Sequence, residues 1–271
     1  MRTVVDVDVE EGTLRGGLPY LRLGRGPVLV DLPGIESRHA NPTGQARALQ
    51  VRQLAPLAEH FEVWAVRRPP GVPAGVTMAD IAAVHAEALT ERFGEPVRVL
   101  GTSTGASIAL QLAADHPATV RRLVLLAGAC RLSEAGRAAQ RRLASATVRG
   151  EHRRAWAATA PVLTPNRAGA AAMAAMMWLT GPAMAPDDPT DMLRVIEAED
   201  AFDVTDRLHL VQAPTLVIGG ARDGYYGAEL FRRTAAGIPG ARLVLHPRRG
   251  HMGVAASRRA LQIADRFLRQ E

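Results

Sequence analysis

Lysine is absent from this sequence of 271 residues, so its 33 basic residues are all arginines. The absence excludes Schiff-base chemistry and the phosphate-binding lysine of a P-loop, because both need a lysine amine. Cysteine is nearly absent as well: Cys130 is the single one, which excludes an intrachain disulfide and a cysteine-based metal cluster. Chemistry that depends on lysine, on an intrachain disulfide or on a cysteine-based metal cluster is therefore ruled out.

Aromatic residues and long apolar runs are also scarce. Phe, Trp and Tyr make up 4% of the chain, and no apolar run approaches the roughly 18 residues of a membrane span. The N-terminal residues alternate valine with acidic residues, a pattern typical of a strand and not of a signal peptide. The net charge is +6, but acidic residues are scattered among the arginines and no basic-aromatic interleaving occurs. We therefore expect a cytoplasmic protein with no nucleic-acid partner and no membrane partner.

What the sequence does contain is a regular alternation of strand and helix patterns. Runs of apolar and β-branched residues predict strands at residues 3–9, 18–23, 27–31, 61–66, 96–100, 121–128, 213–220 and 241–246. Helical spacing of apolar residues separates most of these runs, for example at 78–93. Such an alternation predicts an α/β fold with a mostly parallel central sheet that is flanked by helices on both faces.

The alternation stops after the sixth predicted strand. Residues 133–205 are rich in alanine, arginine and methionine, show helical spacing and contain no convincing strand. We predict that they form a helical cap inserted into a core made of residues 1–132 and 206–271. Because ligands of such sheets bind at the carboxyl ends of the strands, an insertion at that edge can form a lid over the site.

One short turn has the residues of a nucleophile site. The stretch GTSTG, with Ser103 at its centre, follows a predicted strand directly and begins a predicted helix. In that context Gly-x-Ser-x-Gly forms a sharp, strained turn that needs small residues on both sides of the serine. A dinucleotide-binding loop is disfavoured, because a third glycine and the lysine of short-chain dehydrogenases are missing. A turn without chemistry stays open on these five residues alone, and Ser107, one turn inside the helix, is expected to be structural.

Two residues after later strands can complete a catalytic triad with Ser103. A serine nucleophile needs a histidine base within hydrogen-bond reach and a carboxylate that orients the histidine. His251 lies in the loop RRGHMG just after the last predicted strand, and Asp223 follows the strand at 213–220 by a few residues. The chain order Ser103, Asp223, His251, with each residue after its own strand, predicts these three as the catalytic residues.

Together these segments resemble the α/β-hydrolase fold superfamily in its capped, single-domain form. LRLGRGPVLVDLPG is similar to the family's opening strands, GTSTGASIALQLAADHP to its elbow and following helix, APTLVIGGARDGYY to its acid loop and PRRGHMG to its histidine loop. The resemblance implies an oxyanion hole formed by two backbone N–H groups, those of Thr104 and Ile35. Two segments depart from the family: Pro33-Gly34 replaces a frequent His-Gly, and VRRPPGVPAG replaces a frequent Asp-x-Arg-Gly-x-Gly.

The cap sequence indicates the kind of substrate. Met173, Met176, Met177 and Trp178 lie together, and flexible methionines suit a pocket for an apolar small molecule. The alternative is that these apolar residues pack the cap against the core and contact no substrate. Arginines are dense between 131 and 154, which we interpret as a solvated helix face, with recruitment of an anionic substrate or an acidic carrier protein as the alternative.

The sequence therefore predicts a serine hydrolase that cleaves a small, largely apolar ester-like bond through an acyl-enzyme on Ser103, with no metal and no organic cofactor. The same triad also supports carbon–carbon, thioester or lactone hydrolysis. A pathway cyclase or a non-catalytic receptor built on this fold is the alternative from a different class. Epoxide hydrolases and haloalkane dehalogenases are disfavoured, because those relatives have aspartate where this chain has Ser103.

Overall fold

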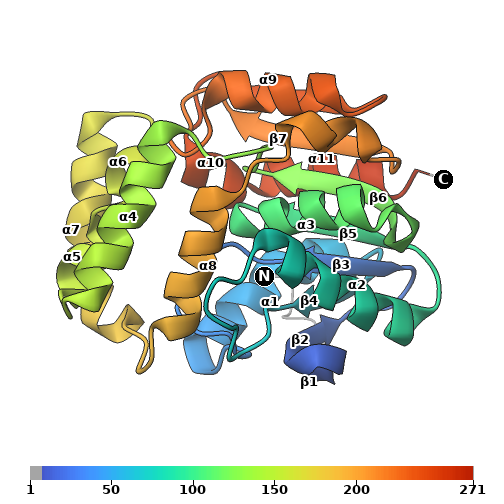
Figure 1. Cartoon of the computed structure of the whole chain (residues 1–271), viewed down its shortest axis with the longest axis horizontal. Coiled ribbons are helices and arrows are strands. Elements are labelled where there is room, and N and C mark those ends of the chain that lie inside the picture. The colour runs from blue at the N-terminus through green and yellow to red at the C-terminus, as the bar shows by residue number, and fades with distance from the viewer. Residues whose placement is uncertain (1–7, 271) are drawn as a thin grey trace, which may run out of the picture.

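Within residues 8–270, a computed structural model places eight strands in one sheet (Figure 1). The strands are β1 (Val9–Leu14), β2 (Leu18–Leu23), β3 (Val28–Leu32), β4 (Glu62–Val66), β5 (Val97–Thr102), β6 (Val120–Leu126), β7 (Thr215–Gly220) and β8 (Arg242–His246). Their order in the sheet is β1-β2-β4-β3-β5-β6-β7-β8. β1 pairs antiparallel with β2 and β2 with β4, whereas all pairs from β4 to β8 are parallel. The carboxyl ends of β3 to β8 therefore meet at one edge of the sheet.

Helices cover both faces of this sheet, as predicted. One face carries α2 (Met78–Phe93), α3 (Thr104–Asp115) and α9 (Gly227–Gly237), and the other carries α1 (Gly44–Ala58) and α11 (Arg258–Leu268). Successive residues of a strand point to opposite faces. In β4, for example, Trp64 is buried in the core under α2 and α3, while Val63 is buried in the core under α1 and α11. The predicted α/β arrangement is confirmed.

The start of the sheet differs from the expectation. The predicted strand at 3–9 lies largely outside the described residues, and β1 instead runs from Val9 to Leu14, through residues expected to form a connection. The reason is a tight hairpin in which Leu14 pairs with Leu18. Gly16 and Gly17 make this turn possible, because both have a positive φ, of 73° and 79°, which glycine adopts without strain.

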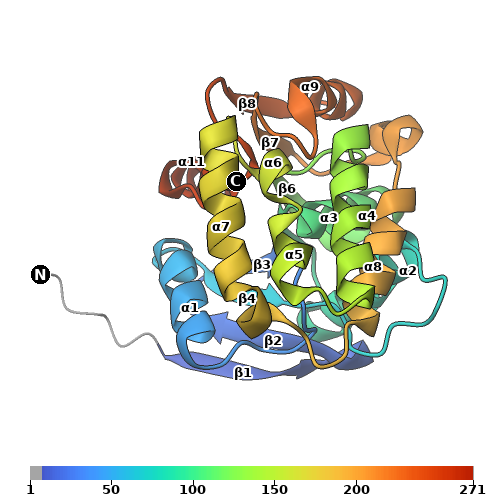
Figure 2. The same ribbon diagram turned by 90° about the vertical axis from the view of Figure 1, so that its left-hand side faces the viewer.

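Helices fill the chain between β6 and β7. They are α4 (Glu134–Val148), α5 (His152–Ala157), α6 (Ala160–Leu163), α7 (Arg167–Met184) and α8 (Thr190–Ala201), followed by a 3-10 helix, η3 (Thr205–Leu210). Figure 2 shows α4 to α8 together on the side of the molecule that faces the viewer, in front of the sheet. α8 also packs into the main core, where Val195 and Ala198 are buried. The division of the chain at 133 and 205 stays a prediction.

Candidate active site

Ser103 lies on a sharp turn between β5 and α3. Its φ is 54° and its ψ is −121°, a conformation that a residue with a side chain rarely adopts. The two flanking glycines make the turn possible. A Cβ atom on Gly105 would lie 2.0 Å from the carbonyl oxygen of Leu32, and one on Gly101 would lie 2.4 Å from that of Gly105. Close approach of the chain to itself therefore requires glycine at both positions, as the sequence pattern indicates.

The structure brings the three predicted triad residues together. The Nε2 atom of His251 lies 3.0 Å from the Oγ atom of Ser103, and its Nδ1 atom lies 2.9 Å from Oδ2 of Asp223. His251 is the first residue of α10 (His251–Ala255), after β8, and Asp223 follows β7. Each is 3% exposed, so water does not compete with this pair. The two hydrogen bonds have the geometry of a nucleophile, its base and the carboxylate that orients the base.

Two tyrosines that sequence reasoning did not select surround the histidine. The backbone N–H groups of Tyr225 and Tyr226 donate to Oδ1 of Asp223, at 2.8 and 3.3 Å. Their rings lie 4.9 and 5.9 Å from the His251 ring, measured between centroids. Burial raises the pKa of both phenols. The two tyrosines therefore hold both the Asp223 carboxylate and the His251 imidazole in place. In the sequence, their position two and three residues after Asp223 is the signal that could have identified them.

The two predicted oxyanion-hole residues lie beside Ser103. Thr104 is the first residue of α3, where a backbone N–H has no partner inside the helix. Ile35 follows Gly34, and a Cβ atom on Gly34 would lie 3.3 Å from the Cβ of Ser103. Ser103, Thr104, Gly34 and Ile35 all line one cavity. Their roles in stabilising an oxyanion stay predictions.

That cavity has a volume of about 720 Å³, within the range typical of small-molecule sites. It lies between the carboxyl edge of the sheet, the loop after β3 and the predicted cap. Its wall beyond the triad is largely apolar. The apolar residues that line it include Ile35, Trp156, Leu163, Met177, Met184, Met252 and Ala255, and the polar ones include Glu36, Arg38, Asn41, Gln140 and Thr159.

Only one of the four cap residues expected at the substrate lines the cavity. Met173 and Met177 both pack against the core, but only Met177 lines the cavity. Met176 and Trp178 are about half exposed, at 53% and 47%. Met173 and Met177 are four residues apart and share one face of α7, whereas Trp178 lies on another face. Met176 lies three residues after Met173, at the solvent-exposed margin of that face. α7 is apolar around most of its circumference, so the sequence alone did not show which face turns inward.

A buried glutamate of α8 lies behind the serine turn. Glu199 is fully buried, and its carboxylate accepts hydrogen bonds from the hydroxyl groups of Thr104 and Ser107, both at 2.8 Å. The side-chain amide of Gln140 on α4 donates to the same carboxylate at 2.7 Å. Burial raises the pKa of Glu199, while the three donors lower it. The hydroxyl of Ser107 thus bonds to Glu199, and its structural role stays a prediction. Glu199 connects two helices of the predicted cap, α4 and α8, to the start of α3.

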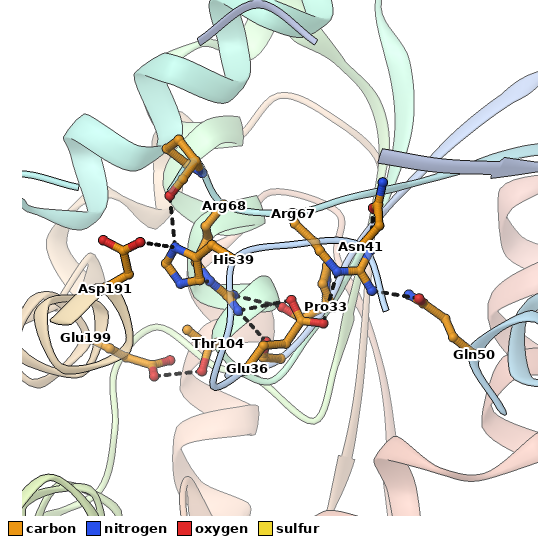
Figure 3. A network of polar contacts seen from close by, with 12 residues as sticks. Pro33, Glu36, His39, Asn41, Gln50, Arg67, Arg68, Thr104, Asp191 and Glu199 are labelled. Carbon is orange, nitrogen blue, oxygen red and sulfur yellow. Dashed lines mark hydrogen bonds and ion pairs between the residues drawn. The ribbon is translucent and has the colours of Figure 1, made fainter. Parts of the chain in front are cut away.

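Buried arginines lie behind the loop after β3 (Figure 3). Arg67 and Arg68, from the segment that departs from the family pattern, are 2% and 1% exposed. Glu36 lies within 3.4 Å of a nitrogen of each. A second, smaller cavity of about 300 Å³ lies between this cluster and α1, and Asp31 and Arg67 line it. The sequence signal was two adjacent arginines at the end of an apolar strand, which is a costly place for charge unless partners are present.

Three further expectations concern ligands and partners. In the described part of the chain, no three His, Cys, Asp or Glu residues are grouped so that they could hold a metal ion. The same residues include no helix that is both long and apolar enough to cross a membrane. Several arginines at the start of the predicted cap pair with acidic neighbours, for example Arg141 with Asp200 at 2.9 Å. An acidic carrier protein as partner stays a prediction.

The fold and the arrangement of this site define an α/β hydrolase. Within that class, the family described as serine aminopeptidase, S33, matches residues 75–252, about two thirds of the chain. The chain belongs to this family. It is also 39% identical over 80 residues to a Yersinia enterocolitica protein named "Putative carbamate hydrolase RutD". That match spans 27% of this chain and 29% of the length of the relative, so it says little about the rest of either protein.

Solved structures share the fold over nearly the whole chain. An α/β hydrolase enzyme, MGS-M2, from a deep-sea metagenome library of the Medee basin superposes with a TM-score of 0.75 and 18% identity, over 93% of this chain and 92% of that one. A thermophilic esterase from Thermogutta terrifontis superposes with a TM-score of 0.72 and 20% identity, over 97% and 100% of the two chains. At these identities the likeness shows the fold alone.

Proposed function

We propose that this protein hydrolyses a carboxylic ester, or a closely related acyl bond, of a small and largely apolar substrate through an acyl-enzyme on Ser103. The observation that carries the proposal is the chain of hydrogen bonds from Ser103 through His251 to Asp223, which opens into an apolar cavity. Ser103 and His251 line this cavity, while Asp223 lies buried behind the histidine.

The geometry supports a two-step acyl transfer. His251 Nε2 takes the proton from Ser103 Oγ as that oxygen attacks the acyl carbon, and the carbonyl π electrons move to the carbonyl oxygen. Backbone N–H groups of Thr104 and Ile35 stabilise the resulting oxyanion. The tetrahedral intermediate collapses, and the leaving alcohol takes the proton from His251. Water then attacks the acyl carbon while His251 takes its proton, and the second tetrahedral intermediate collapses. The bond to Ser103 Oγ breaks, that oxygen regains a proton from His251, and the carboxylic acid leaves. Asp223 stabilises the imidazolium in both steps.

The cavity supports a preference for apolar acyl or alcohol groups. Trp156, Leu163 and Met177 contribute apolar surface to it from the predicted cap. A substrate of this kind gains binding free energy from burial of its apolar area. The stretch of similarity to a protein named as a carbamate hydrolase makes a carbamate ester the second bond to assay, since its acyl carbon is open to the same attack.

A fluorophosphonate probe and a panel of p-nitrophenyl esters of increasing acyl length test this proposal. We expect stoichiometric labelling on Ser103, found by peptide mass spectrometry, and no labelling or turnover with Ser103→Ala. Ser107→Ala is the matched control, because it removes the nearest other serine, one turn inside α3, and leaves the triad intact. Labelling that persists in Ser103→Ala would exclude Ser103 as nucleophile, and a wild-type protein with no turnover of any ester would favour the cyclase or receptor alternative.

The role of the acid has its own test. Asp223→Asn leaves the shape of the site unchanged but no longer favours the tautomer of His251 that can accept the serine proton. By analogy with other triads, we expect kcat to fall about 10,000-fold. A variant with near wild-type kcat would mean that another carboxylate orients the histidine.

A further inference from the structure

One wall of the cavity is held from behind by a fully buried arginine. Arg68 lies just after β4 and is 1% exposed. Its Nη1 donates to the carbonyl oxygen of Pro33 at 3.2 Å, and its Nη2 donates to that of Gly34 at 2.9 Å. A single planar guanidinium thus spans two successive carbonyl groups of the loop after β3, a geometry that the fixed fork of arginine can satisfy and a lysine amine cannot.

Further contacts fix this guanidinium in place. Its Nε donates to Nε2 of His39 at 3.3 Å, and Nδ1 of His39 lies 2.8 Å from the carbonyl oxygen of Pro69. Burial lowers the pKa of His39 to about 4, so the imidazole is neutral and can accept through Nε2. The carboxylate of Glu36 lies 3.4 Å from Nη2 and balances the charge. Figure 3 shows the guanidinium of Arg68 between His39 and Glu36.

Holding the Gly34 carbonyl also sets the direction of a neighbouring N–H group. The Gly34 carbonyl and the Ile35 N–H belong to one peptide unit, and in a trans unit the two point in opposite directions. Arg68 does not line the cavity, whereas Gly34 and Ile35 do. With the carbonyl turned toward Arg68, the N–H of Ile35 is therefore directed to the side that holds Ser103. Among residues 8–270, this N–H has no hydrogen-bond partner, so it is free to donate to a ligand.

We propose that Arg68 is a positioning residue for the oxyanion hole: it clamps the carbonyl groups of Pro33 and Gly34 and so directs the N–H of Ile35 at the carbonyl oxygen of a substrate bound to Ser103. The inference rests on the proposed hydrolase function. Arg68 acts only through the loop and touches no substrate. The Pro33-Gly34 segment, which lacks the frequent histidine of the family, is held in this way from outside the loop.

Two variants of Arg68 and one of its neighbour test this role. Arg68→Met removes the charge and both donors, whereas Arg68→Lys keeps the buried positive charge beside Glu36 and loses the two-pronged contact. Arg67→Met is the matched control. Arg67 is equally buried and also faces Glu36, but its side-chain hydrogen bonds are to the side chains of Gln50 and Asn41, and none is to a carbonyl of the loop.

The readouts separate positioning from stability. For each variant, kcat and KM are measured on the best p-nitrophenyl ester, and kcat is expressed per serine labelled by fluorophosphonate at completion. Inhibition by an alkyl trifluoromethyl ketone, which forms a tetrahedral oxyanion with the serine, is measured alongside. We expect kcat of Arg68→Met to fall about 100- to 1,000-fold, as when an oxyanion donor is lost, with KM changed less than threefold. The inhibition constant should rise in proportion to the loss of kcat/KM.

We expect an intermediate loss of kcat for Arg68→Lys and a kcat near wild type for Arg67→Met. This difference in kcat should remain even if the melting temperatures of Arg68→Met and Arg67→Met fall by similar amounts. If Arg68→Met does not fold, Arg68→Lys carries the test, with at least a tenfold loss expected. A kcat per labelled site within twofold of wild type in the Arg68 variants would overturn the inference, as would an equal loss in Arg67→Met. Absence of labelling at Ser103 in the wild type would instead refute the proposed function itself.

Discussion

The buried carboxyl of Asp31 leads to a quantitative prediction about pH and stability. Asp31 lies on β3, is 7% exposed and lines the small cavity behind the loop. Burial raises the pKa of Asp31 from 3.8 to about 7, Arg67 lowers it in part, and Glu36 raises it further. The native state thus keeps a proton that the unfolded chain releases near pH 4. A raised carboxyl pKa contributes stability at low pH, and that stability is lost as the pH rises through about 7.

The size of the effect follows from the shift. The change in the pKa of Asp31 from 3.8 to about 7 corresponds to about 4 kcal/mol in the free energy of unfolding, between pH values well below and well above both pKa values. Between pH 5 and pH 8, the wild type should lose about 2.5 kcal/mol of that amount, because the unfolded chain is already largely ionised at pH 5. Asp31→Asn carries no charge at either pH and loses none of it. Relative to wild type, the variant should therefore gain about 2.5 kcal/mol of unfolding free energy on going from pH 5 to pH 8.

Urea unfolding followed by far-UV circular dichroism at pH 5 and pH 8 measures this difference directly. Two buried histidines whose pKa burial lowers to about 4, His39 and His85, destabilise the protein as the pH falls, so the profile of the wild type alone is ambiguous. That contribution cancels between wild type and Asp31→Asn. Asp206→Asn, at an exposed site, reports any general effect of removing a carboxylate. If the unfolding free energies of Asp31→Asn and wild type differ by the same amount at pH 5 and pH 8, the Asp31 carboxyl is ionised in the native state at both pH values. That result would refute the argument.

Three further substitutions have predictable outcomes. Gly105→Ala places a Cβ atom 2.0 Å from the Leu32 carbonyl oxygen and should lower the free energy of unfolding by about 3 kcal/mol. Thermal melting should show a fall of about 10 °C in the melting temperature, and an unchanged value would contradict the close packing of the turn. Glu199→Ala leaves three buried hydrogen-bond donors unpaired, so urea unfolding should show a loss of at least about 3 kcal/mol in unfolding free energy. A loss below about 1 kcal/mol would mean that water replaces the carboxylate. Met177→Ala should lower kcat/KM for long-chain esters about tenfold, while Trp178→Ser, on the exposed face of α7, leaves it unchanged; equal effects would mean that α7 turns a different face to the substrate.

The parts of the site that sequence could predict are those whose position follows from the ends of strands. Ser103, Asp223 and His251 each come shortly after a parallel strand, and the carboxyl ends of such strands meet at one edge. Local pattern therefore places them in space. The glycines beside Ser103 add a steric demand that is visible in the sequence itself. For these reasons the sequence alone selects three residues whose first and last members lie 148 positions apart.

The parts that sequence could not predict depend on how separate elements pack. Glu199 lies in the ordinary helical pattern IEAEDA, and nothing in that stretch distinguishes it from Glu197, which is exposed, or from Asp200, which is half-buried. Its burial results from the crossing of α8 over the serine turn. The role of Arg68 could not be predicted either, because it depends on the path of the loop after β3, which brings two carbonyl groups within reach of the guanidinium. On α7, apolar residues on most faces leave the inward face undetermined, so the sequence pattern predicts Met176 and Trp178 at the substrate although both are exposed.

The contacts of α8 also bear on where the core ends and the cap begins. By sequence, α8 lies within the helical insertion, yet Glu199 holds the hydroxyl of Thr104 and the carboxylate of Asp191 accepts the backbone N–H groups of Gly71 and Val72, at 2.8 and 3.0 Å. Gly71 and Val72 belong to the same segment after β4 as Arg68. The helix is thus bonded to the segments behind both proposed oxyanion donors. The division of the chain at 133 and 205 stays a prediction, and wherever it falls these hydrogen bonds join α8 to the serine turn and to the segment after β4.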